Sequence, residues 1–332
     1  MALAAILGLS GPDLTAEEGA FLAETRPWGV ILFRRNIDHD ADGAVRLQRL
    51  TADIRNRLGS DAPIFVDQEG GSVQRLRPPL ARAWPDAAAQ AGGARAVWLR
   101  HRLMAAELRA VGIDADCAPV IDLGGPATHP FLRKRVWSDE PETLVAKTRA
   151  ACDGLLAGGV LPVIKHLPGH GGADADSHHA LPVDPRPLPA LMAADFAVTR
   201  ALADQKLGMT AHVLYPALDP DLPGTLSPAV IAHLRGALGF DGLLMTDDIE
   251  MHALGGSMGA RAAQAIAAGC DLVLHCSGDM AGMQAVACNA GALSGRALQR
   301  AEEALAQRRA PGPIDSAALQ AELEGLERGA VG

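Results

Sequence analysis

Short apolar segments recur along the chain, and each is followed by a longer stretch with the apolar spacing of a helix. Most of these segments are continuously apolar rather than alternating, which is typical of parallel strands buried on both faces of a sheet. We count eight of them, at residues 3–9, 29–33, 64–67, 113–119, 161–166, 208–212, 242–247 and 271–276. The pattern therefore predicts eight strands that alternate with helices.

The stretches between these segments carry helix signals. Thr15 opens a TAEE run that resembles a capping box, and Ser227 precedes a proline at the first helical position. Residues 95–111 and 142–156 have the charged and apolar positions of amphipathic helices. A strand followed by a helix eight times over predicts an α/β protein with a (β/α)8 TIM barrel. An open doubly wound sheet is the alternative, but its GxGxxG phosphate signature follows none of the early strands.

The chain of 332 residues shows no low-complexity segment, charge block or linker that would divide it. We therefore expect a single barrel domain that spans residues 1–332. From residue 294 onward the sequence is rich in Ala, Glu, Leu and Arg, which predicts extra C-terminal helices that cover the barrel. The apolar residues 1–11 follow no Lys or Arg and are predicted to form a buried first strand rather than a signal peptide.

Charge and cysteine content narrow the class of protein. Thirty Lys and Arg against 39 Asp and Glu give a net charge of −9. This argues against nucleic-acid or anionic-membrane partners, which need a basic face. The five cysteines are an odd number without CxxC spacing, so we expect reduced, mostly buried thiols and a cytoplasmic location. We also expect a monomer.

Polar and charged residues gather at the carboxyl ends of the predicted strands, where barrel enzymes place their active sites. A charged residue at the end of a buried strand is costly unless it is paired or used. Several around one mouth predict an enzyme with a polar site rather than an inert scaffold. These residues are Arg34, Arg35, Asp67, Gln68, Glu69, Asp122, Lys165, His166, His212, Asp247, Asp248 and His275.

The densest of these segments, KHLPGHGGADADSHH, covers residues 165–179. From the spacing alone, three interpretations are open. His166, His170 and His178 could bind zinc, or the histidines could belong to a solvated loop without a role. In the third interpretation Asp176 orients the imidazole of His178 for general acid–base catalysis. The HxH pattern near a first strand, which marks many metal-dependent barrel hydrolases, is missing, and this weakens the zinc interpretation.

A second candidate group lies in the run TDDIEM at residues 246–251. Asp247 directly follows an apolar strand, so its carboxylate should stand at the mouth of the barrel. There it could attack an anomeric carbon and form a covalent glycosyl intermediate, or it could simply cap a helix. Asp248 and Glu250 are expected to have structural or helix-capping roles.

A third candidate group lies in the run DQEGGSVQR at residues 67–75. Asp67 ends a strand, and the glycine pair at 70–71 lets the backbone turn so that Arg75 folds back toward the mouth. A carboxylate in this position could accept two vicinal hydroxyls of a sugar. It could equally form an ion pair with Arg75 that only stabilises the loop. Arg135 is a further candidate donor.

Five motifs follow one another in a fixed order: DQEGG with VQR at 67–75, KHxPGHG at 165–171, DSH at 176–178, MTAH at 209–212 and TDDIEM at 246–251. Together they closely resemble the cytoplasmic β-N-acetylglucosaminidases of glycoside hydrolase family 3, which act in bacterial peptidoglycan recycling. The resemblance extends from about residue 6 to residue 276. The length also fits the single-domain members of that family.

The resemblance implies a role for each matching residue. Asp247 corresponds to the catalytic nucleophile, His178 to the acid/base, and Asp176 to the partner of His178 in a dyad. The run at 209–212 matches a strand that lines the same pocket, so His212 is a candidate for the sugar-binding wall of the pocket or for a place directly behind it. The residues that match those holding the terminal N-acetylglucosamine are Asp67, Arg75, Arg135, Lys165 and His166.

Two positions and one run of residues depart from the family pattern. Leu167 stands where phenylalanine is usual, and Ser72 stands where arginine is frequent. The run HPFLRKR at 129–135 is a divergent setting, so Arg133 remains the alternative to Arg135 for contact with the sugar.

By resemblance, the chain is expected to be a retaining exo-β-N-acetylglucosaminidase with no metal and no cofactor. Its substrate, a small saccharide or muropeptide, would be N-acetylglucosamine linked β-1,4 to 1,6-anhydro-N-acetylmuramic acid, with or without peptide. A histidine that titrates near neutrality suits both the acid step and the later base step. The alternatives are a family-3 enzyme that prefers another sugar or uses phosphate as acceptor, a zinc-dependent hydrolase, and a sugar-binding barrel without catalysis.

Overall fold

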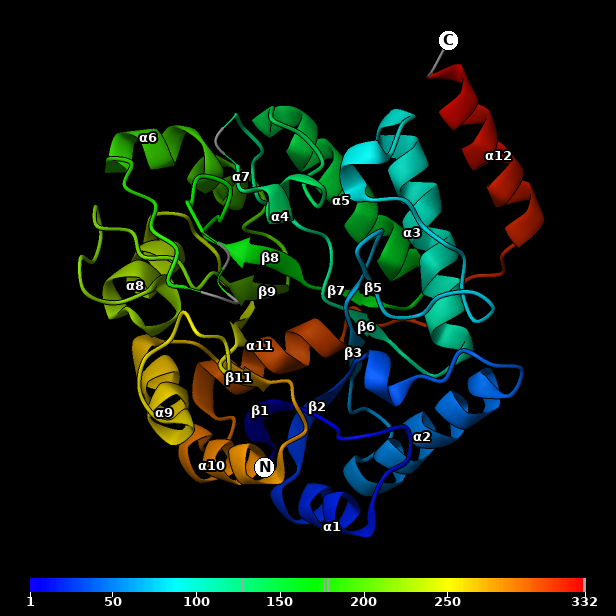
Figure 1. Cartoon of the computed structure of the whole chain (residues 1–332), viewed down its shortest axis with the longest axis horizontal. Coiled ribbons are helices and arrows are strands. Elements are labelled where there is room, and N and C mark those ends of the chain that lie inside the picture. The colour runs from blue at the N-terminus through cyan, green and yellow to red at the C-terminus, as the bar shows by residue number, and fades with distance from the viewer. Residues whose placement is uncertain (127, 176, 178–179, 331–332) are drawn as a thin grey trace.

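The structure is a computed structural model that describes residues 1–126, 128–175, 177 and 180–330. In this part of the chain, nine parallel strands form one sheet, and helices surround it (Figure 1). The strands of this sheet are β1 (Leu3–Gly8), β2 (Pro27–Leu32), β3 (Ile64–Val66), β6 (Ala115–Asp116), β7 (Leu161–Pro162), β8 (Ile164–Leu167), β9 (Leu207–Thr210), β10 (Leu243–Asp248) and β11 (Leu272–His275).

The sheet closes into a barrel through one interrupted strand. Its order is β7-β6-β3-β2-β1-β11-β10-β9-β8, so the two edges of the sheet are β7 and β8. These two strands are consecutive in the chain, and only Val163 separates them. The backbone N–H of Val163 donates to Asp116 O at 2.9 Å, and that of Lys165 donates to Pro119 O at 3.1 Å. The sheet thus has eight strand positions, and the predicted (β/α)8 barrel is confirmed.

Each strand position is followed by at least one helix, in the order predicted from the sequence. The Thr15 side chain accepts from the backbone N–H of Glu18 in a capping box, and the Ser227 side chain accepts from that of Val230. These caps begin α1 and α8. The helices that follow the strands are α1 (Ala16–Thr25), α2 (Gly43–Leu58), α3 (Gly93–Ala110), α4 (Pro130–Arg133), α5 (Pro141–Ala157), α6 (Leu188–Ala193), α7 (Asp195–Ala201), α8 (Pro228–Gly236), α9 (Met258–Ala268) and α10 (Met280–Ala290).

Two further helices follow the barrel, as the C-terminal composition predicts. In α11 (Gly295–Leu305), Ala301 and Ala304 are buried in the same apolar cluster as residues that begin strands, such as Leu207 and Leu243. This helix therefore covers the amino-terminal end of the barrel. The last helix, α12 (Ser316–Gly329), lies at the outside against α3 and buries Leu323 there (Figure 1).

Most of the cysteines are buried, as the sequence predicts. All five cysteines are free, and every one except Cys288 is buried. Within the described ranges, none of the helices combines the length and the apolar character that crossing a membrane requires.

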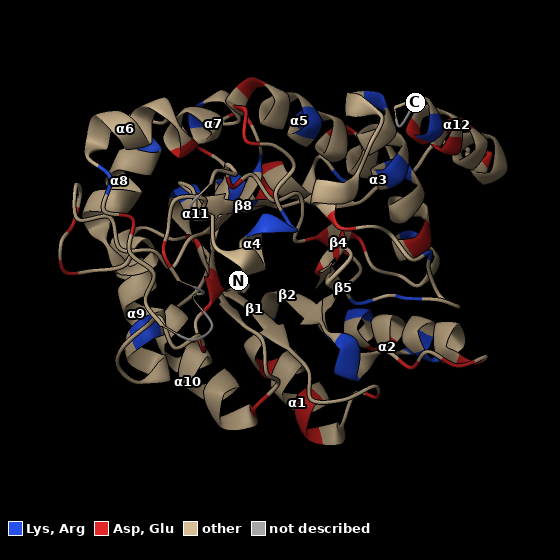
Figure 2. Ribbon diagram, turned by 45° about the horizontal axis from the view of Figure 1, so that its top comes forward, with Lys and Arg blue, Asp and Glu red and all other residues tan. Residues whose placement is uncertain are grey.

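A small antiparallel hairpin follows β3 at the carboxyl end of the barrel. It consists of β4 (Gln68–Gly70) and β5 (Val73–Gln74). Gly71 has a φ of 56°, and a Cβ there would lie 1.9 Å from Asp86 Oδ1, so the turn accepts only glycine. The hairpin returns the chain toward the mouth, as the glycine pair predicts. Figure 2 shows the acidic residue of β4 and the basic residue of β8 close to the middle of the barrel.

Candidate active site

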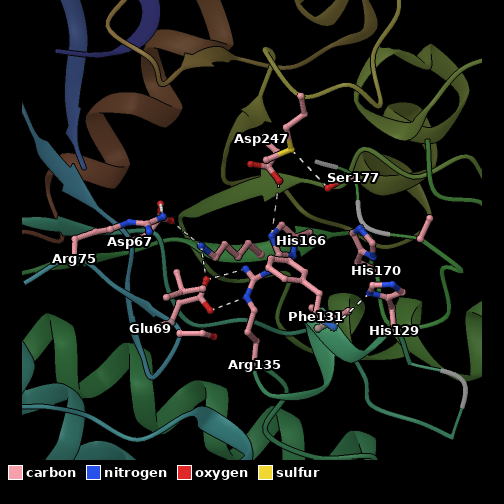
Figure 3. A pocket seen from close by; sticks show the side chains of 16 residues that line it. Asp67, Glu69, Arg75, His129, Phe131, Arg135, His166, His170, Ser177 and Asp247 are labelled. Atoms are coloured by element: carbon pink, nitrogen blue, oxygen red, sulfur yellow. Dashed lines mark hydrogen bonds and ion pairs between the residues drawn. The ribbon is translucent and has the colours of Figure 1, made fainter. Parts of the chain in front are cut away.

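A cavity of about 240 Å³ opens at the carboxyl ends of the strands (Figure 3). It is lined by side chains from the hairpin, β8, β10 and the segment around α4. Six residues proposed from the sequence line it, namely Asp67, Arg75, Arg135, Lys165, His166 and Asp247. Glu69, His129, Phe131 and His170 line it as well. The strand ends thus bring together residues that are up to 180 positions apart.

Lys165 lies at the centre of a network of opposite charges. Its Nζ lies 2.8 Å from Asp67 Oδ1 and 2.7 Å from Glu69 Oε1. Arg75 Nη2 lies 3.1 Å from the other oxygen of Asp67. Arg135 donates two hydrogen bonds to Glu69, of 2.9 Å from Nε and 2.8 Å from Nη2. Three cations therefore alternate with two carboxylates along one wall of the cavity.

This network keeps its members charged. Burial by itself raises the pKa of Asp67 and Glu69, but the neighbouring cations outweigh it. Lys165 and Arg75 hold the pKa of Asp67 well below its usual range, and Arg135 with Lys165 lowers the pKa of Glu69 to about 2. The two carboxylates raise the pKa of Lys165 against the opposing effect of burial. The wall is thus a fixed array of charged donors and acceptors at neutral pH.

Replacement of Lys165 by Met is expected to lower the free energy of unfolding by about 3–5 kcal/mol at pH 7, because two buried carboxylates lose a shared cation. In the native protein the folded pKa values of both carboxyls lie below their unfolded values of about 3.9 and 4.3. Their stabilising contribution is present above that range and is lost as the pH falls. The deficit of the variant should therefore shrink below about pH 4. Urea unfolding from pH 3 to pH 8 measures it.

Lys206→Met is the matched control, because Lys206 forms one ion pair with Glu303 and both side chains are well exposed. We expect it to cost less than about 1 kcal/mol at any pH in this range. A deficit of Lys165→Met that equals the control, or that grows as the pH falls, would contradict the charge network.

A buried arginine donates hydrogen bonds to the backbone of the hairpin and of the segment that follows it. Arg100 has no solvent-exposed surface and donates to Glu69 O at 2.5 Å and to Pro85 O at 2.8 Å. It also donates to Gln90 Oε1 at 3.0 Å, and Gln90 donates to Glu327 Oε1 in α12 at 2.8 Å. The C-terminal helix is thus linked through two side chains to the backbone that carries Glu69. Neither link can be predicted from a local pattern.

Asp247 is the penultimate residue of β10, with its carboxylate in the cavity and 9% of its surface exposed. Burial raises its pKa, but the nearby imidazole of His166 and the ammonium of Lys165 help to lower it further than burial raises it. Its Oδ1 accepts the backbone N–H of Asp248 at 2.8 Å. Asp247 is therefore an ionised carboxylate that faces an open space, which is what a nucleophile requires.

The neighbouring carboxyl behaves differently. Asp248 is absent from the cavity lining among the described residues, and its Oδ1 accepts the backbone N–H of Glu250 at 3.1 Å. Burial raises its pKa to about 7. Strand alternation thus separates the two adjacent aspartates, and Asp248 takes the turn-capping position expected from the sequence.

His166 is oriented by Asp122, a carboxylate that was predicted only as one of the polar residues at the strand ends. Its Nδ1 donates to Asp122 Oδ2 at 2.7 Å, and Nε2 lies 3.8 Å from Asp247 Oδ2. Asp122 is fully buried and also accepts the backbone N–H of His170 at 2.8 Å. The charge of His166 and these hydrogen bonds lower the pKa of Asp122 to about 2. Its place at a strand end was the only signal in the sequence.

His212 lies behind the cavity rather than in its described lining. It has no exposed surface, and burial lowers its pKa. Nε2 must donate to Asp248 O, which lies 3.0 Å away, so Nδ1 of the neutral ring accepts from Thr225 Oγ1 at 2.7 Å. His212 therefore holds the backbone next to Asp247.

The two arginines of the HPFLRKR run occupy different places. Arg133 forms a two-point ion pair with Asp139 at 2.5 and 3.0 Å, and almost half of its side chain is exposed. Arg135 lies in the cavity wall on Glu69, and its guanidinium lies 4.9 Å from the ring centre of Phe131. Of the two, Arg135 lines the cavity. The ion pair with Glu69 holds Arg135 in the cavity wall. From the sequence, Glu69 was predicted only as one of the polar residues at the strand ends, and no partner was predicted for it.

Asp176 and His178 lie outside the described residues. Their neighbours Ala175 and Ser177 line the cavity. Ser177 Oγ lies 3.6 Å from Met251 Sδ, and Ser177 O accepts the backbone N–H of Ala253 at 3.3 Å. Ala175 and Ser177 thus lie at the cavity, and Ser177 contacts the loop that follows β10 (Figure 3).

Within the ranges that the structure describes, no group of three or more His, Cys, Asp or Glu side chains could hold a metal ion. His166 uses Nδ1 on Asp122. The zinc interpretation also requires His178, which is outside these ranges, and the effect of EDTA on activity tests it.

A closed barrel whose carboxyl end holds an ionised carboxylate and an array of charged hydrogen-bonding groups defines an enzyme for a polar, hydroxyl-rich substrate. The family model described as the glycosyl hydrolase family 3 N terminal domain matches residues 6–307. The chain belongs to this family of glycoside hydrolases. The predicted family and enzyme class are confirmed.

Relatives within the family have consistent names. The chain is 40% identical to a β-hexosaminidase of Alkalilimnicola ehrlichii over 284 residues, which cover 82% of this chain and 80% of that protein. A β-hexosaminidase of Pseudomonas aeruginosa is 38% identical, with 82% of each chain covered. NagZ from Neisseria gonorrhoeae in complex with N-trifluoroacetyl-D-glucosamine has a TM-score of 0.86 and 30% identity, with 98% of each chain covered.

Proposed function

We propose that the chain is a retaining exo-β-N-acetylglucosaminidase that releases terminal N-acetylglucosamine through a covalent intermediate on Asp247. The observation that carries this proposal is the buried, ionised carboxylate of Asp247 beside His166, at the edge of a wall of charged hydrogen-bonding groups. The names of the hexosaminidase relatives and the amino-sugar complex of NagZ support the choice of sugar.

The size and charges of the cavity favour one terminal sugar. Its volume of about 240 Å³ lies below the roughly 300–1,000 Å³ usual for pockets that take drug-sized ligands. Asp67 and Glu69 can accept hydrogen bonds from sugar hydroxyls, and Arg75, Arg135 and Lys165 can donate to them. Because these five groups already pair with one another, they are held in place before the sugar arrives.

The family resemblance assigns the acid/base to His178, and the charge states of the other carboxylates support this assignment. In the described lining of the cavity, Asp67 and Glu69 are the carboxylates besides Asp247, and cations keep both ionised. Neither can serve as a general acid near neutral pH, which a second carboxylate of raised pKa normally does in retaining glycosidases. His178, with Asp176 as its partner, is the acid/base in this proposal.

The reaction then has two steps. Asp247 attacks the anomeric carbon while His178 gives a proton to the glycosidic oxygen, and the aglycone leaves. His178 next takes a proton from water, which attacks the same carbon and releases N-acetylglucosamine. The physiological substrate in this proposal is N-acetylglucosamine β-1,4-linked to 1,6-anhydro-N-acetylmuramic acid, with or without peptide, in cell-wall recycling. A cytoplasmic monomer is part of the same proposal.

The direct test compares nitrophenol release from the β-N-acetylglucosaminide and from the β-glucoside, each with and without EDTA. We expect turnover of the N-acetyl substrate alone, unchanged by EDTA. Preference for the glucoside would discard the amino-sugar pocket, and loss of activity with EDTA would favour the zinc site of His166, His170 and His178. Release of N-acetylglucosamine 1-phosphate in phosphate buffer would show that the acceptor is phosphate rather than water, so that the reaction is phosphorolysis.

A further inference from the structure

Residues 169–184 form a loop within the segment that connects β8 to α6. One arginine of the same segment joins the two ends of this loop. Arg186 donates from Nε to Asp184 Oδ1 at 2.8 Å and from Nη2 to Asp184 Oδ2 at 2.5 Å. The same Nη2 lies 2.6 Å from Asp195 Oδ2 at the start of α7. Asp195 Oδ1 in turn accepts the backbone N–H of Gly171 at 3.1 Å. Arg186 therefore connects the end of the loop, through Asp195, to its beginning.

The glycines of this loop allow the contact. A Cβ at Gly172 would lie 2.2 Å from Arg186 Nη2, and a Cβ at Gly171 would lie 2.8 Å from Asp195 Oδ1. The guanidinium and the carboxylate thus pack directly on the backbone, where any side chain would displace them. This is a structural use for part of the GHGG run that the sugar-binding and catalytic roles do not explain.

The segment that follows β9 forms hydrogen bonds with both ends of the loop. The backbone N–H of Asp184 donates to Leu214 O at 2.9 Å, and that of Leu214 donates to Pro182 O at 2.9 Å. The hydroxyl of Tyr215 donates to Gly169 O at 2.6 Å. The base of the loop is therefore fixed to the barrel at its beginning and at its end.

The charges make Arg186 hard to replace. Asp184 has no exposed surface and Asp195 has 2%. Burial raises the pKa of Asp195, and Arg186 opposes this effect. The hydrogen bond to Asp184 raises the pKa of Arg186 itself. Among the described residues, Arg186 is the ion-pair partner of both carboxylates. Its removal would leave two neighbouring carboxylates buried without a cation.

We propose that Asp184, Arg186 and Asp195 form a positioning clamp that fixes the base of loop 169–184, the loop whose Ala175 and Ser177 line the cavity. The inference rests on the proposed function, because this loop carries Asp176 and His178 in the sequence. The clamp residues touch no reacting atom. They act by limiting the positions that the acid/base can take.

Arg186→Met tests the clamp with a series of aryl β-N-acetylglucosaminides that differ in the pKa of the phenol. We expect kcat/KM to fall at least about tenfold for phenyl or methoxyphenyl leaving groups and less than about threefold for dinitrophenyl, because only poor leaving groups need the acid. Arg186→Lys should recover part of this loss, since it restores the charge but not the two-point geometry. An equal loss for every leaving group would overturn the proposal.

Arg300→Met is the matched control. Arg300 also bridges two aspartates, Asp241 at 2.7 Å and Asp271 at 3.0 Å, but it does so at the amino-terminal end of the barrel. We expect this variant to lower the melting temperature without any change in leaving-group dependence. If Arg300→Met changes that dependence as much as Arg186→Met does, the effect reflects general destabilisation and the clamp is refuted.

Hydrogen–deuterium exchange separates the clamp from the assignment of the acid/base. Amide exchange in peptides from 169–184 should speed up in Arg186→Met and stay unchanged in Arg300→Met. Unchanged exchange in Arg186→Met would overturn the clamp. If His178→Ala shows no leaving-group dependence, the proposed function loses its acid/base, and the exchange comparison alone then decides the clamp.

Discussion

Asp247→Asn is expected to lower kcat by about 10⁴-fold or more, which is the scale on which loss of a nucleophile or its activating group acts. Asn has the same shape and still accepts the backbone N–H of Asp248, which lies 2.8 Å from Oδ1 in the native protein. What it lacks is the charge that attacks the anomeric carbon. The loss should therefore come without a matching loss of stability. Turnover of a dinitrophenyl β-N-acetylglucosaminide, together with the melting temperature, measures both.

A trapping experiment gives an independent readout of the same prediction. A slow fluorinated glycoside should add one sugar to the native protein, on the peptide that contains Asp247, and none to Asp247→Asn. Asp248→Asn is the adjacent control, and it should keep activity within about tenfold because Asp248 is outside the described lining of the cavity. A sugar attached to a different residue, or an active Asp247→Asn, would remove Asp247 from its role.

His178→Ala is expected to lower kcat/KM by about 10²–10⁴-fold for substrates with poor leaving groups. For dinitrophenyl substrates the first step needs no proton, so the loss there should be small. The difference between the two substrates separates an acid from a residue that only binds the sugar. The variant should also show a pH–rate profile without the limb that the acid causes in the native enzyme.

His170→Gln is the control for this comparison. His170 lines the same cavity and is nearly buried, and burial lowers its pKa, so it is a poor acid near neutrality. We expect His170→Gln to affect good and poor leaving groups equally. If it reproduces the leaving-group dependence and His178→Ala does not, the acid/base lies at His170.

Much of the fold follows from local patterns. Eight apolar runs marked the strand positions, because a strand buried on both faces must be continuously apolar. The capping signals at Thr15 and Ser227 marked helix starts, since an N-cap needs only residues within one turn. The interruption at Val163, which divides one strand into β7 and β8, has no such local signal.

The site was predictable where chemistry and strand ends coincide. Asp67 directly follows β3, Lys165 lies in β8 and Asp247 lies next to the last residue of β10, and parallel strands in a barrel bring their carboxyl ends to one mouth. The family resemblance gave Arg135 a place at the sugar, but the choice between Arg135 and Arg133 depended on Glu69 and Asp139, their respective partners in the structure. Pairing of this kind depends on which side chains meet after folding.

The sequence by itself thus determined the barrel and the set of polar residues at its mouth, because these follow from apolar periodicity and from residue types at strand ends. Its ordered motifs indicated the family by resemblance. Only the tertiary structure decided the partners: Asp122 on His166, His212 behind Asp247, and Arg186 between Asp184 and Asp195. The reason is physical. The charge state and orientation of a buried side chain are determined by neighbours from other strands and loops, and local sequence carries no record of them.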